Sequence, residues 1–518
     1  MVKEDEISKL IESRYCLDEI LQRPYEWETE RVEKLITDLT RDKKHFIGDI
    51  ITWNDEDKGI KYLFNGQQRI TTIYILLANI KNHPKVDIDT KEAIKNMLYT
   101  VSKNDYKLEK KLKLRKKDDE VLSEILENNI KKSKSKLTKA YKFITDKFTG
   151  KMNETELKVF FQTIYKNLRY LERECESRAE GIEQFERINS CCQPLKPGRR
   201  GISKLYSIYC EDENKYGDKI KNFLSELSDM DDKDTKESIA LYLYSKTGEY
   251  KEYDFTDTID NEKDKGVDVV KEFYDFYHGI YKDVIDNSNE LFKNKIFTTT
   301  PALRCVYIDI YSGKYEAINK LSESEKEKVY KAFEWGFISN KIKNASTNPL
   351  PKLTGILSTY KEESGMTVFD FVVKCLDKNE VYAKTDELKY YPLDNNAFFV
   401  NLFRRIEYQY EQDNNLKEAS KTDRPSTEHI YPKTPEEELP INPNLRETIG
   451  NKSILDAKLN AKLKNLLPSK KFKEYAGSVY HINSKHLATY TEWNDENIKS
   501  NADFYMGFIK KFYNVLEE

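Results

Sequence analysis

The stretch that decides the fold of the first part of this chain is Tyr62–Tyr74, which reads YLFNGQQRITTIY. Its apolar start is typical of a short strand, Gly66 permits a tight turn, and the apolar run that follows predicts a long helix. The unpaired N–H groups of a helix start favour an anion there, and the planar guanidinium of Arg69 suits a phosphate. An ordinary polar turn capped by Asn65 or Thr71 is the alternative.

The segments before this stretch predict a hairpin. Residues 46–53 have strand composition, residues 54–59 have turn composition, and Lys61–Phe64 has the composition of the partner strand. The second strand therefore ends where the polar turn begins.

Two helices are expected before the hairpin, at 7–22 and 28–39, because apolar residues recur there at helical spacing. Gln22 and Arg23 lie at the end of the first helix, next to a proline that disfavours helix. Gln67–Arg69 also lie at an element end. These two groups could therefore converge on one pocket.

Composition excludes several classes of protein. The chain has 518 residues, enough for roughly three domains, and its net charge of −3 excludes a protein coated in positive charge. Local basic patches for nucleic acid remain compatible with it. No apolar run approaches the length of a membrane helix, and the seven scattered cysteines indicate neither a zinc site nor a disulfide framework. We expect a soluble, cytoplasmic protein without a membrane partner.

The middle of the chain offers weaker signals. Helical periodicity covers 137–172, with a break at Gly150. The basic run Lys107–Lys117 contains a short predicted strand, and a solvated strand edge is favoured there over a patch that contacts phosphate. Residues 197–201 are expected to form a loop, and their two adjacent arginines make it a candidate phosphate contact.

The remaining pattern sets the expected domain organisation. Residues 216–410 are helical in pattern, with an exposed loop expected at 250–265, and a polar linker follows at 411–426. The many aromatic residues of the helical region are expected to be core residues. The expected domains are therefore 1–215, 216–410 and 411–518.

Four segments of the first domain carry a resemblance to a known family. They are LQRPYEW at Leu21–Trp27, FIGDI at Phe46–Ile50, NGQQRITT at Asn65–Thr72 and FERINSCCQPL at Phe185–Leu195. The first three, in order and spacing, resemble the GmrS-type domain of GmrSD-type, modification-dependent (type IV) restriction endonucleases, and the fourth resembles a further segment of that domain. The last segment has Cys192 where the family usually has glycine.

This resemblance implies a fold similar to the ParB/sulfiredoxin family, in which a Gly-x-x-Arg turn before a helix holds a nucleotide phosphate. It implies a nucleoside triphosphate as ligand. Asn65 stands where the family usually has aspartate, and an amide orients a metal or water less well, so nucleotide hydrolysis is less expected than nucleotide or DNA binding. The residues that the resemblance assigns to the nucleotide are Gln22, Arg23, Asn65, Gly66, Gln67, Gln68, Arg69 and Thr71.

A second group of motifs lies near the end of the chain. STEHIYPK at Ser426–Lys433 is followed by IGNKSIL at Ile449–Leu455, and Asn460 comes nine residues after Asn451. The span 426–471 resembles the HNH (ββα-metal) nuclease core of the GmrD-type domain. In that core an acidic-His-hydrophobic-x-Pro strand precedes an Asn-containing turn and a helix that carries a metal ligand.

Phosphodiester hydrolysis needs a base near neutral pKa and a hard divalent cation, which prefers oxygen ligands. By the resemblance, His429 is the general base, Glu428 and Asn460 bind Mg²⁺ or Mn²⁺, and Asn451 positions His429 or the turn. Lys462 or Lys464 is assigned to the DNA strand that is cut. An ordinary loop histidine is the alternative for His429.

The leading hypothesis is a metal-dependent DNA endonuclease or nickase of phage defence. It would act on modified double-stranded phage DNA under the control of nucleotide binding or hydrolysis, and a homo-oligomer is left open. The expected fold is α+β and multidomain, with a ParB/sulfiredoxin-like domain, a mostly helical connector and a ββα-metal HNH domain. One rival is a ParB-like, nucleotide-dependent DNA-binding regulator with a degenerate nuclease domain. Another is a nucleotide-dependent enzyme whose C-terminal domain serves only in docking.

Overall fold

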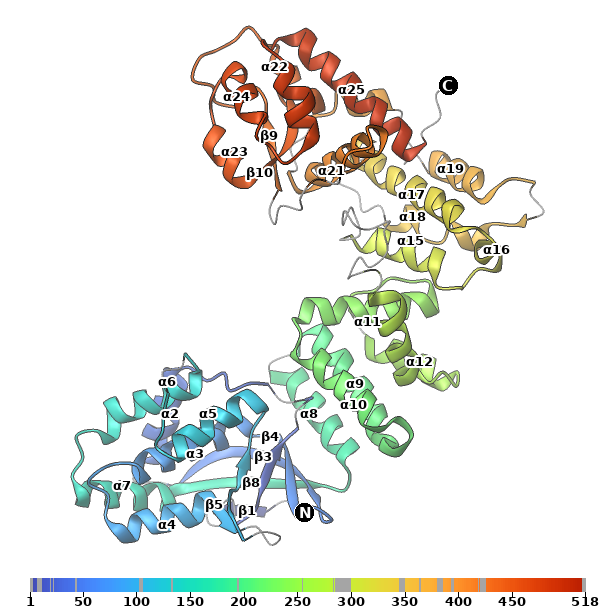
Figure 1. The fold of residues 1–518 in the computed structure, drawn as a ribbon. Helices are drawn as coiled ribbons and strands as arrows, with labels where there is room; N and C mark the ends of the chain where they lie inside the picture. Colours follow the sequence, from blue (N-terminus) through green and yellow to red (C-terminus); the bar gives the residue numbers. More distant parts are fainter. Residues whose placement is uncertain are drawn as a thin grey trace. The chain divides into compact units, whose positions relative to one another are not determined.

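The computed structural model shows a multidomain α+β protein, as predicted (Figure 1). Two compact units divide the chain. Unit 1 comprises residues 1–239 and 252–274, and unit 2 comprises 240–251 and 275–518. The predicted boundaries at 215 and 410 stay predictions. The structure describes residues 3–6, 12–18, 20–21, 23–41, 44–101, 106–131, 134–192, 195–253, 255–282, 284, 300–343, 350–362, 365–379, 385–392, 396–417, 419 and 425–514.

Unit 1 contains a six-stranded mixed sheet. Its strands are β1 (Lys3–Glu6), β2 (Tyr15–Leu17), β3 (His45–Asp55), β4 (Ile60–Asn65), β7 (Leu112–Lys113) and β8 (Leu168–Cys175). Across the sheet they follow the order β1-β8-β3-β4-β2-β7. β3 and β4 form the predicted antiparallel hairpin, and β3 pairs in parallel with β8 on its other side. β2 is parallel to both β4 and β7.

Two of these strands lie where the sequence predicts helix. β2 falls within the predicted helix at 7–22, and β8 begins within the helical span predicted at 137–172. β8 carries charged side chains, which concealed its strand character. Lys61 of β4 forms ion pairs with Glu172 at 2.7 Å and with Glu174 at 2.9 Å. These cross-strand pairs explain how so charged a segment lies inside the sheet.

The central helix of unit 1 is α3 (Gln67–Lys81), in which every residue from Ile70 to Ile80 is buried. It packs against α4 (Ile88–Leu98), α5 (Lys116–Leu126) and α6 (Lys136–Ile144). A helix buried on all sides has no polar face to show in its sequence. Its packing fixes the position of its first turn at the end of β4.

Two other predictions for unit 1 have different outcomes. The helix predicted at 28–39 is confirmed as α2 (Thr29–Leu39), which buries Val32, Leu35, Ile36 and Leu39. Residues 197–201 do not form the predicted loop. They begin α9 (Pro197–Glu211), because proline is favoured in the first helical turn.

Helices continue through the rest of unit 1. The charge-rich segment 250–265 is predicted to be an exposed loop, but most of it forms the helix α12. Among the described residues of both units, none of the helices is long and apolar enough to cross a membrane. The helices that follow the sheet are α8 (Arg178–Cys192), α9, α10 (Glu213–Asp229), α11 (Asp232–Thr247) and α12 (Phe255–Asp264).

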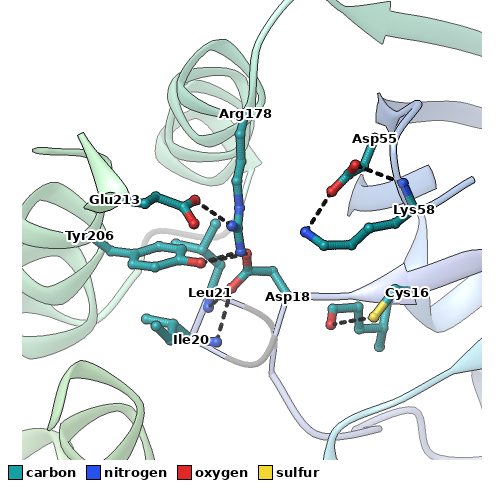
Figure 2. A network of polar contacts seen from close by, with 10 residues as sticks. Cys16, Asp18, Ile20, Leu21, Asp55, Lys58, Arg178, Tyr206 and Glu213 are labelled. Carbon is teal, nitrogen blue, oxygen red and sulfur yellow. Dashed lines mark hydrogen bonds and ion pairs between the residues drawn. The ribbon is translucent and has the colours of Figure 1, made fainter. Parts of the chain in front are cut away.

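A buried polar network joins the loop after β2 to these helices, as Figure 2 shows. Arg178 Nη2 donates to Asp18 Oδ2 over 2.7 Å, and Arg178 Nη1 donates to Glu213 Oε1 over 2.7 Å. Tyr206 donates its hydroxyl to Asp18 Oδ2 over 3.0 Å. Because Asp18 is fully buried and paired, the network holds the segment that leads to Arg23 against α8, α9 and α10.

The larger hydrophobic core of unit 2 runs from Val284 to Tyr513. It therefore joins helices of the predicted connector to residues of the predicted nuclease domain. Arg405 and Glu334 form a buried ion pair within it, with Arg405 Nη2 and Glu334 Oε2 2.8 Å apart. The main helices are α15 (Pro301–Tyr311), α17 (Glu323–Lys343), α19 (Val368–Lys378), α21 (Asn396–Asp413) and α25 (Asp495–Tyr513).

Candidate functional site

A cavity of about 770 Å³ lies beside the start of α3 in unit 1, and we call it the α3 cavity. A volume of this size suits a ligand as large as a nucleotide. Its walls come from the segment before α2, the first residues of α2, the end of β4, the first turn of α3, the start of α6 and Phe185 of α8. Six of the predicted nucleotide contacts border it: Arg23, Asn65, Gly66, Gln67, Gln68 and Arg69.

The first turn of α3 supplies hydrogen-bond donors to this cavity. Gly66 has φ 96°, a left-handed conformation that favours glycine, and α3 has no side-chain cap. The first intrahelical bond joins Ile70 N to Gly66 O, so the N–H groups of the residues between them have no partner within the helix. Such a helix start attracts an anion.

Arg69 is held at the cavity wall by the backbone of β3. Its Nη2 donates to Asp49 O over 3.0 Å and its Nη1 donates to Ile47 O. A Cβ at Gly48 would lie 2.0 Å from Nη1, so only glycine permits this approach. Asn65 Nδ2 also donates to Asp49 O, over 3.0 Å. The arginine thus uses two of its five N–H donors on β3, and burial lowers its pKa.

Gln68 brings the other predicted segment to the same cavity. Its Nε2 donates to Pro24 O over 3.0 Å, and its Oε1 accepts from Glu26 N over 2.8 Å. Both polar groups of the amide are therefore used to hold the backbone of this segment. As a result Arg23 borders the same cavity as Gln68 and Arg69.

Of the two remaining predicted nucleotide contacts, Thr71 and Gln22, the structure describes only Thr71. Thr71 is 2% exposed and is not among the residues that border the cavity. Gln22 lies outside the residues that the structure describes. Sequence reasoning missed Arg31 and Lys136, which border the cavity and carry positive charge. Neither belongs to a motif, and only the position of each in the first turn of a helix could have indicated them.

The second site lies in unit 2, on a strand–strand–helix arrangement. β9 (Pro425–His429) and β10 (Lys452–Asp456) pair antiparallel, and α23 (Ala457–Leu463) follows directly. His429 is the last residue of β9 and lies opposite Lys452. This arrangement places the histidine at the edge of the hairpin, where its side chain is 18% exposed.

A carboxylate that sequence reasoning missed holds the imidazole of His429. Glu447 Oε2 lies 3.1 Å from His429 Nε2 and 2.7 Å from Lys452 Nζ. Among the described residues, His429 Nδ1 has no hydrogen-bond partner. If Nε2 donates its proton to Glu447, the lone pair of Nδ1 is available as a base. Glu447 lies 18 residues after His429, a spacing that no motif marks.

The charges around the imidazole favour its neutral form. Burial and repulsion from Lys452 lower the pKa of His429, and the hydrogen bond to Glu447 opposes this only in part. Lys452 and His429 in turn lower the pKa of Glu447 to about 2 against the effect of its burial. His429 is therefore deprotonated at neutral pH, the state that a general base requires.

Glu428 lies on the opposite face of β9 from His429, because successive strand residues point to opposite faces. It is 3% exposed, and its Oε1 accepts from Lys471 Nζ over 2.6 Å and from the Tyr475 hydroxyl over 3.1 Å. Lys471 also donates to the carbonyl oxygen of His429 over 2.6 Å. The structure therefore places the Glu428 carboxylate in a buried ion pair and does not bring it to the imidazole.

Asn451 is fully buried and uses its whole side chain inside the protein. Its Oδ1 accepts from Tyr431 N and from Trp493 Nε1, both over 2.9 Å. Its Nδ2 donates to Tyr431 O over 3.0 Å and to Arg446 O over 2.9 Å. The amide thus joins the residues after His429 to the residue before Glu447, which is a positioning arrangement.

The other predicted residues lie on or near α23. Asn460 Nδ2 donates to Ser426 Oγ over 2.7 Å and to Thr427 O over 3.1 Å. Its Oδ1 has no partner among the described residues. Lys462 is exposed and pairs with Glu474 at 2.6 Å, and Lys464 is exposed at the end of the helix. Both lysines are accessible to a polyanion.

The predicted metal ligands do not converge in this arrangement. Asn460 presents an amide oxygen, whereas the Glu428 carboxylate neutralises Lys471. Within the part of the chain that the structure describes, no three His, Cys, Asp or Glu side chains are grouped as a metal site. The residues present therefore do not fit a cation held by Glu428 and Asn460 together.

Comparison with known proteins identifies the architecture. The family model described as the GmrSD restriction endonuclease N-terminal domain matches residues 7–198, which hold the α3 cavity. The model described as the GmrSD restriction endonuclease C-terminal domain matches residues 377–507, which hold the His429 site. This chain belongs to the GmrSD-type restriction endonucleases by its domain architecture. No curated protein matches it. The GmrSD families imply a DNA endonuclease, a hydrolase of phage defence whose substrate is DNA.

Glu447→Gln tests the support that the GmrSD-type nuclease gives to His429. We expect the cleavage rate to fall by about 10–100-fold, the usual cost of removing a group that orients an active-site histidine. The pKa of His429 falls as well, because Glu447 raises it, so the acid limb of the pH–rate profile moves to lower pH. Glu436→Gln is the matched control, since Glu436 is 44% exposed and pairs with Lys470. A wild-type profile for Glu447→Gln contradicts the role.

Proposed function

We propose that this chain is a DNA endonuclease or nickase of phage defence that acts on modified DNA, with His429 as its general base and a nucleotide in the α3 cavity as its regulator. The observation that carries the proposal is the His429–Glu447 pair, at 3.1 Å, on a β-hairpin followed by a helix. A ββα-metal HNH core has this order of elements. The ParB/sulfiredoxin-like fold is proposed for the sheet and α3 of unit 1.

In this proposal His429 Nδ1 accepts a proton from water, and the resulting hydroxide attacks the phosphorus. The bond from phosphorus to the leaving sugar oxygen breaks, that oxygen takes a proton from solvent to become a hydroxyl, and His429 later returns its proton to solvent. Glu447 stabilises the imidazolium that forms, because its carboxylate is ionised and hydrogen-bonded to Nε2. Asn451 holds the turn, and Lys462 or Lys464 contacts the DNA backbone.

A divalent cation, Mg²⁺ or Mn²⁺, remains the proposed cofactor. It would offset charge on the phosphate when bound. Glu428 pairs with Lys471, so its carboxylate is not available to hold the cation. The metal requirement is therefore a separate variable of the assay.

In the α3 cavity, the N–H groups of the first turn of α3 and the remaining donors of Arg69 would bind a nucleotide phosphate. Asn65 donates to Asp49 O rather than presenting a carboxylate, so the proposal gives nucleotide binding precedence over nucleotide hydrolysis. A nucleoside triphosphate is the expected class of ligand.

The test is cleavage of a panel of glucosylated, methylated, phosphorothioated and plain duplex DNA by the full chain. Each substrate is assayed with Mg²⁺, Mn²⁺ or chelator, and with or without each nucleoside triphosphate. We expect metal-dependent cleavage of one modified class. DNA binding without cleavage in every condition would instead support a ParB-like regulator with a degenerate nuclease domain.

Arg69→Ala tests the nucleotide site. We expect the affinity for nucleoside triphosphate to fall by about tenfold to a hundredfold, because hydrogen bonds to a charged group are lost. Isothermal titration calorimetry of the full chain measures it. Arg41→Ala is the matched control, since Arg41 is 69% exposed and pairs with Asp38 on the surface. Equal affinities of the two variants would reject a phosphate role for Arg69.

A further inference from the structure

Two arginines from distant parts of the sequence, Arg23 and Arg115, lie on segments that a hydrogen bond joins, and Arg23 borders the α3 cavity. Two residues later, Tyr25 N donates to Asp118 Oδ2 over 2.7 Å, which holds this segment against the first turn of α5. Arg115 is the residue immediately before α5. The hydrogen bond therefore brings the segment of Arg23 to the segment of Arg115.

A third arginine, Arg199, comes to the same place from α9. Arg115 Nη2 forms an ion pair with Asp229 Oδ1 at the end of α10. Arg199 N donates to Asp232 Oδ1 over 3.0 Å, at the start of α11. Both arginines are thus fixed to the short turn between α10 and α11. We call Arg23, Arg115 and Arg199 the arginine cluster.

The guanidinium of Arg199 is poorly compensated. Its Nη1 is buried and has no hydrogen-bond partner among the described residues. Burial and repulsion from Arg115 and Arg23 lower the pKa of Arg199 to about 10, although Asp232 and Glu26 attract its charge. A buried, unpaired N–H on a cation that repels its neighbours costs folding free energy, and an anion would remove that cost.

We propose that the arginine cluster is a second phosphate subsite, which adjoins the α3 cavity at Arg23 and takes a further phosphate of a nucleotide whose first phosphate lies at the α3 turn. The inference rests on the proposed nucleotide function of this cavity. Arg23 connects the two ends, because it borders the cavity and belongs to the cluster. In this proposal a nucleoside monophosphate occupies only the first turn of α3. A triphosphate chain contacts both the α3 turn and the arginine cluster, so the cluster favours nucleoside triphosphates.

The experiment is isothermal titration calorimetry of the full chain with one nucleoside as its mono- and triphosphate, and with inorganic tripolyphosphate. Arg199→Gln is expected to weaken triphosphate binding by about tenfold or more, the cost of a lost charged hydrogen bond, and to leave monophosphate binding unchanged. Arg187→Gln is the matched control. Arg187 is 70% exposed on α8 and pairs with Glu183, so this variant is expected to bind as wild type does.

The outcomes separate the subsite from the proposed function. Equal triphosphate affinity in Arg199→Gln and Arg187→Gln overturns the subsite and leaves nucleotide binding at α3 intact. If the wild type binds no nucleotide, the proposed function fails. The subsite is then judged by tripolyphosphate, which must bind to the wild type and be lost in Arg199→Gln. Failure of the wild type to bind tripolyphosphate overturns the subsite.

Two further measurements test whether Arg199→Gln acts through folding or through DNA binding. The melting temperature of Arg199→Gln without ligand is expected to equal or exceed that of the wild type, because a repelled charge is removed. If this variant does not fold, Arg199→Lys decides, since it keeps a charge but loses the planar fork. Its triphosphate affinity is expected to be weaker than that of the wild type, and equal affinity overturns the subsite. A loss of duplex DNA affinity with unchanged nucleotide affinity also overturns it, in favour of a DNA contact.

Discussion

His429→Ala is expected to reduce the rate of DNA cleavage by about 100-fold to 10,000-fold, the contribution of a general base. The reason is geometric. His429 is the last residue of β9, and Glu447 holds its Nε2. Among the described residues its Nδ1 has no hydrogen-bond partner, so this nitrogen is available to water. Initial rates on the modified DNA that the panel identifies provide the measurement.

His481→Ala is the matched control for this prediction. Its Nε2 contacts the carbonyl oxygen of Lys417 over 2.8 Å and lies 3.8 Å from Glu411, so the ring serves other partners than Glu447 and the variant is expected to cleave as wild type does. The melting temperature of His429→Ala should stay close to that of the wild type, because its side chain is partly exposed. Cleavage by His429→Ala at the wild-type rate would leave the imidazole without a catalytic role.

Lys471→Met is expected to destabilise the protein by about 3–5 kcal/mol, because it leaves the buried carboxylate of Glu428 without its partner. The lysine is fully buried, lies 2.6 Å from that carboxylate and also donates to the backbone of His429. Lys470→Met is the matched control. Lys470 forms an exposed pair with Glu436, so its loss should cost less than about 1 kcal/mol. Urea unfolding monitored through unit 2 measures both.

The loss of stability in Lys471→Met is expected to change with pH. Burial raises the pKa of Glu428, and Lys471 lowers it, so the substitution raises the folded-state pKa further. A carboxyl group with a raised folded pKa destabilises the fold as pH rises above its unfolded value of about 4.3. The deficit of Lys471→Met should therefore be smaller at low pH than at neutral pH. Equal stability of the two variants at neutral pH contradicts the buried ion pair.

The sequence predicted the local elements that short-range patterns encode. The hairpin of β3 and β4, the glycine turn at Gly66 and helix α2 follow from strand composition, backbone freedom and helical spacing, and the structure confirms them. β8 was missed for a physical reason. Its charged residues are compensated by Lys61 on another strand, and a partner about a hundred residues away leaves no local pattern.

At the His429 site, one assignment could have been corrected from the sequence, and one functional residue could not have been found from it. Glu428 and His429 are adjacent on a strand, so strand geometry alone predicts that they point to opposite faces. The sequence alone therefore argues against placing the Glu428 carboxylate and the His429 imidazole in one active site. Glu447 could not have been found in this way, since it comes from a turn that Asn451 holds in place through hydrogen bonds to distant backbone.

We propose that a nucleotide in unit 1 controls hydrolysis at His429 in unit 2. The most direct measurement is the cleavage of modified duplex DNA by the wild type and by His429→Ala, each with and without nucleoside triphosphate, at fixed Mg²⁺. We expect the nucleotide to change the wild-type rate by about tenfold or more. We expect His429→Ala to cleave at least about 100-fold more slowly than the wild type in both conditions, while it retains wild-type nucleotide affinity. Cleavage by His429→Ala at the wild-type rate, or a wild-type rate that ignores the nucleotide, would contradict this proposal.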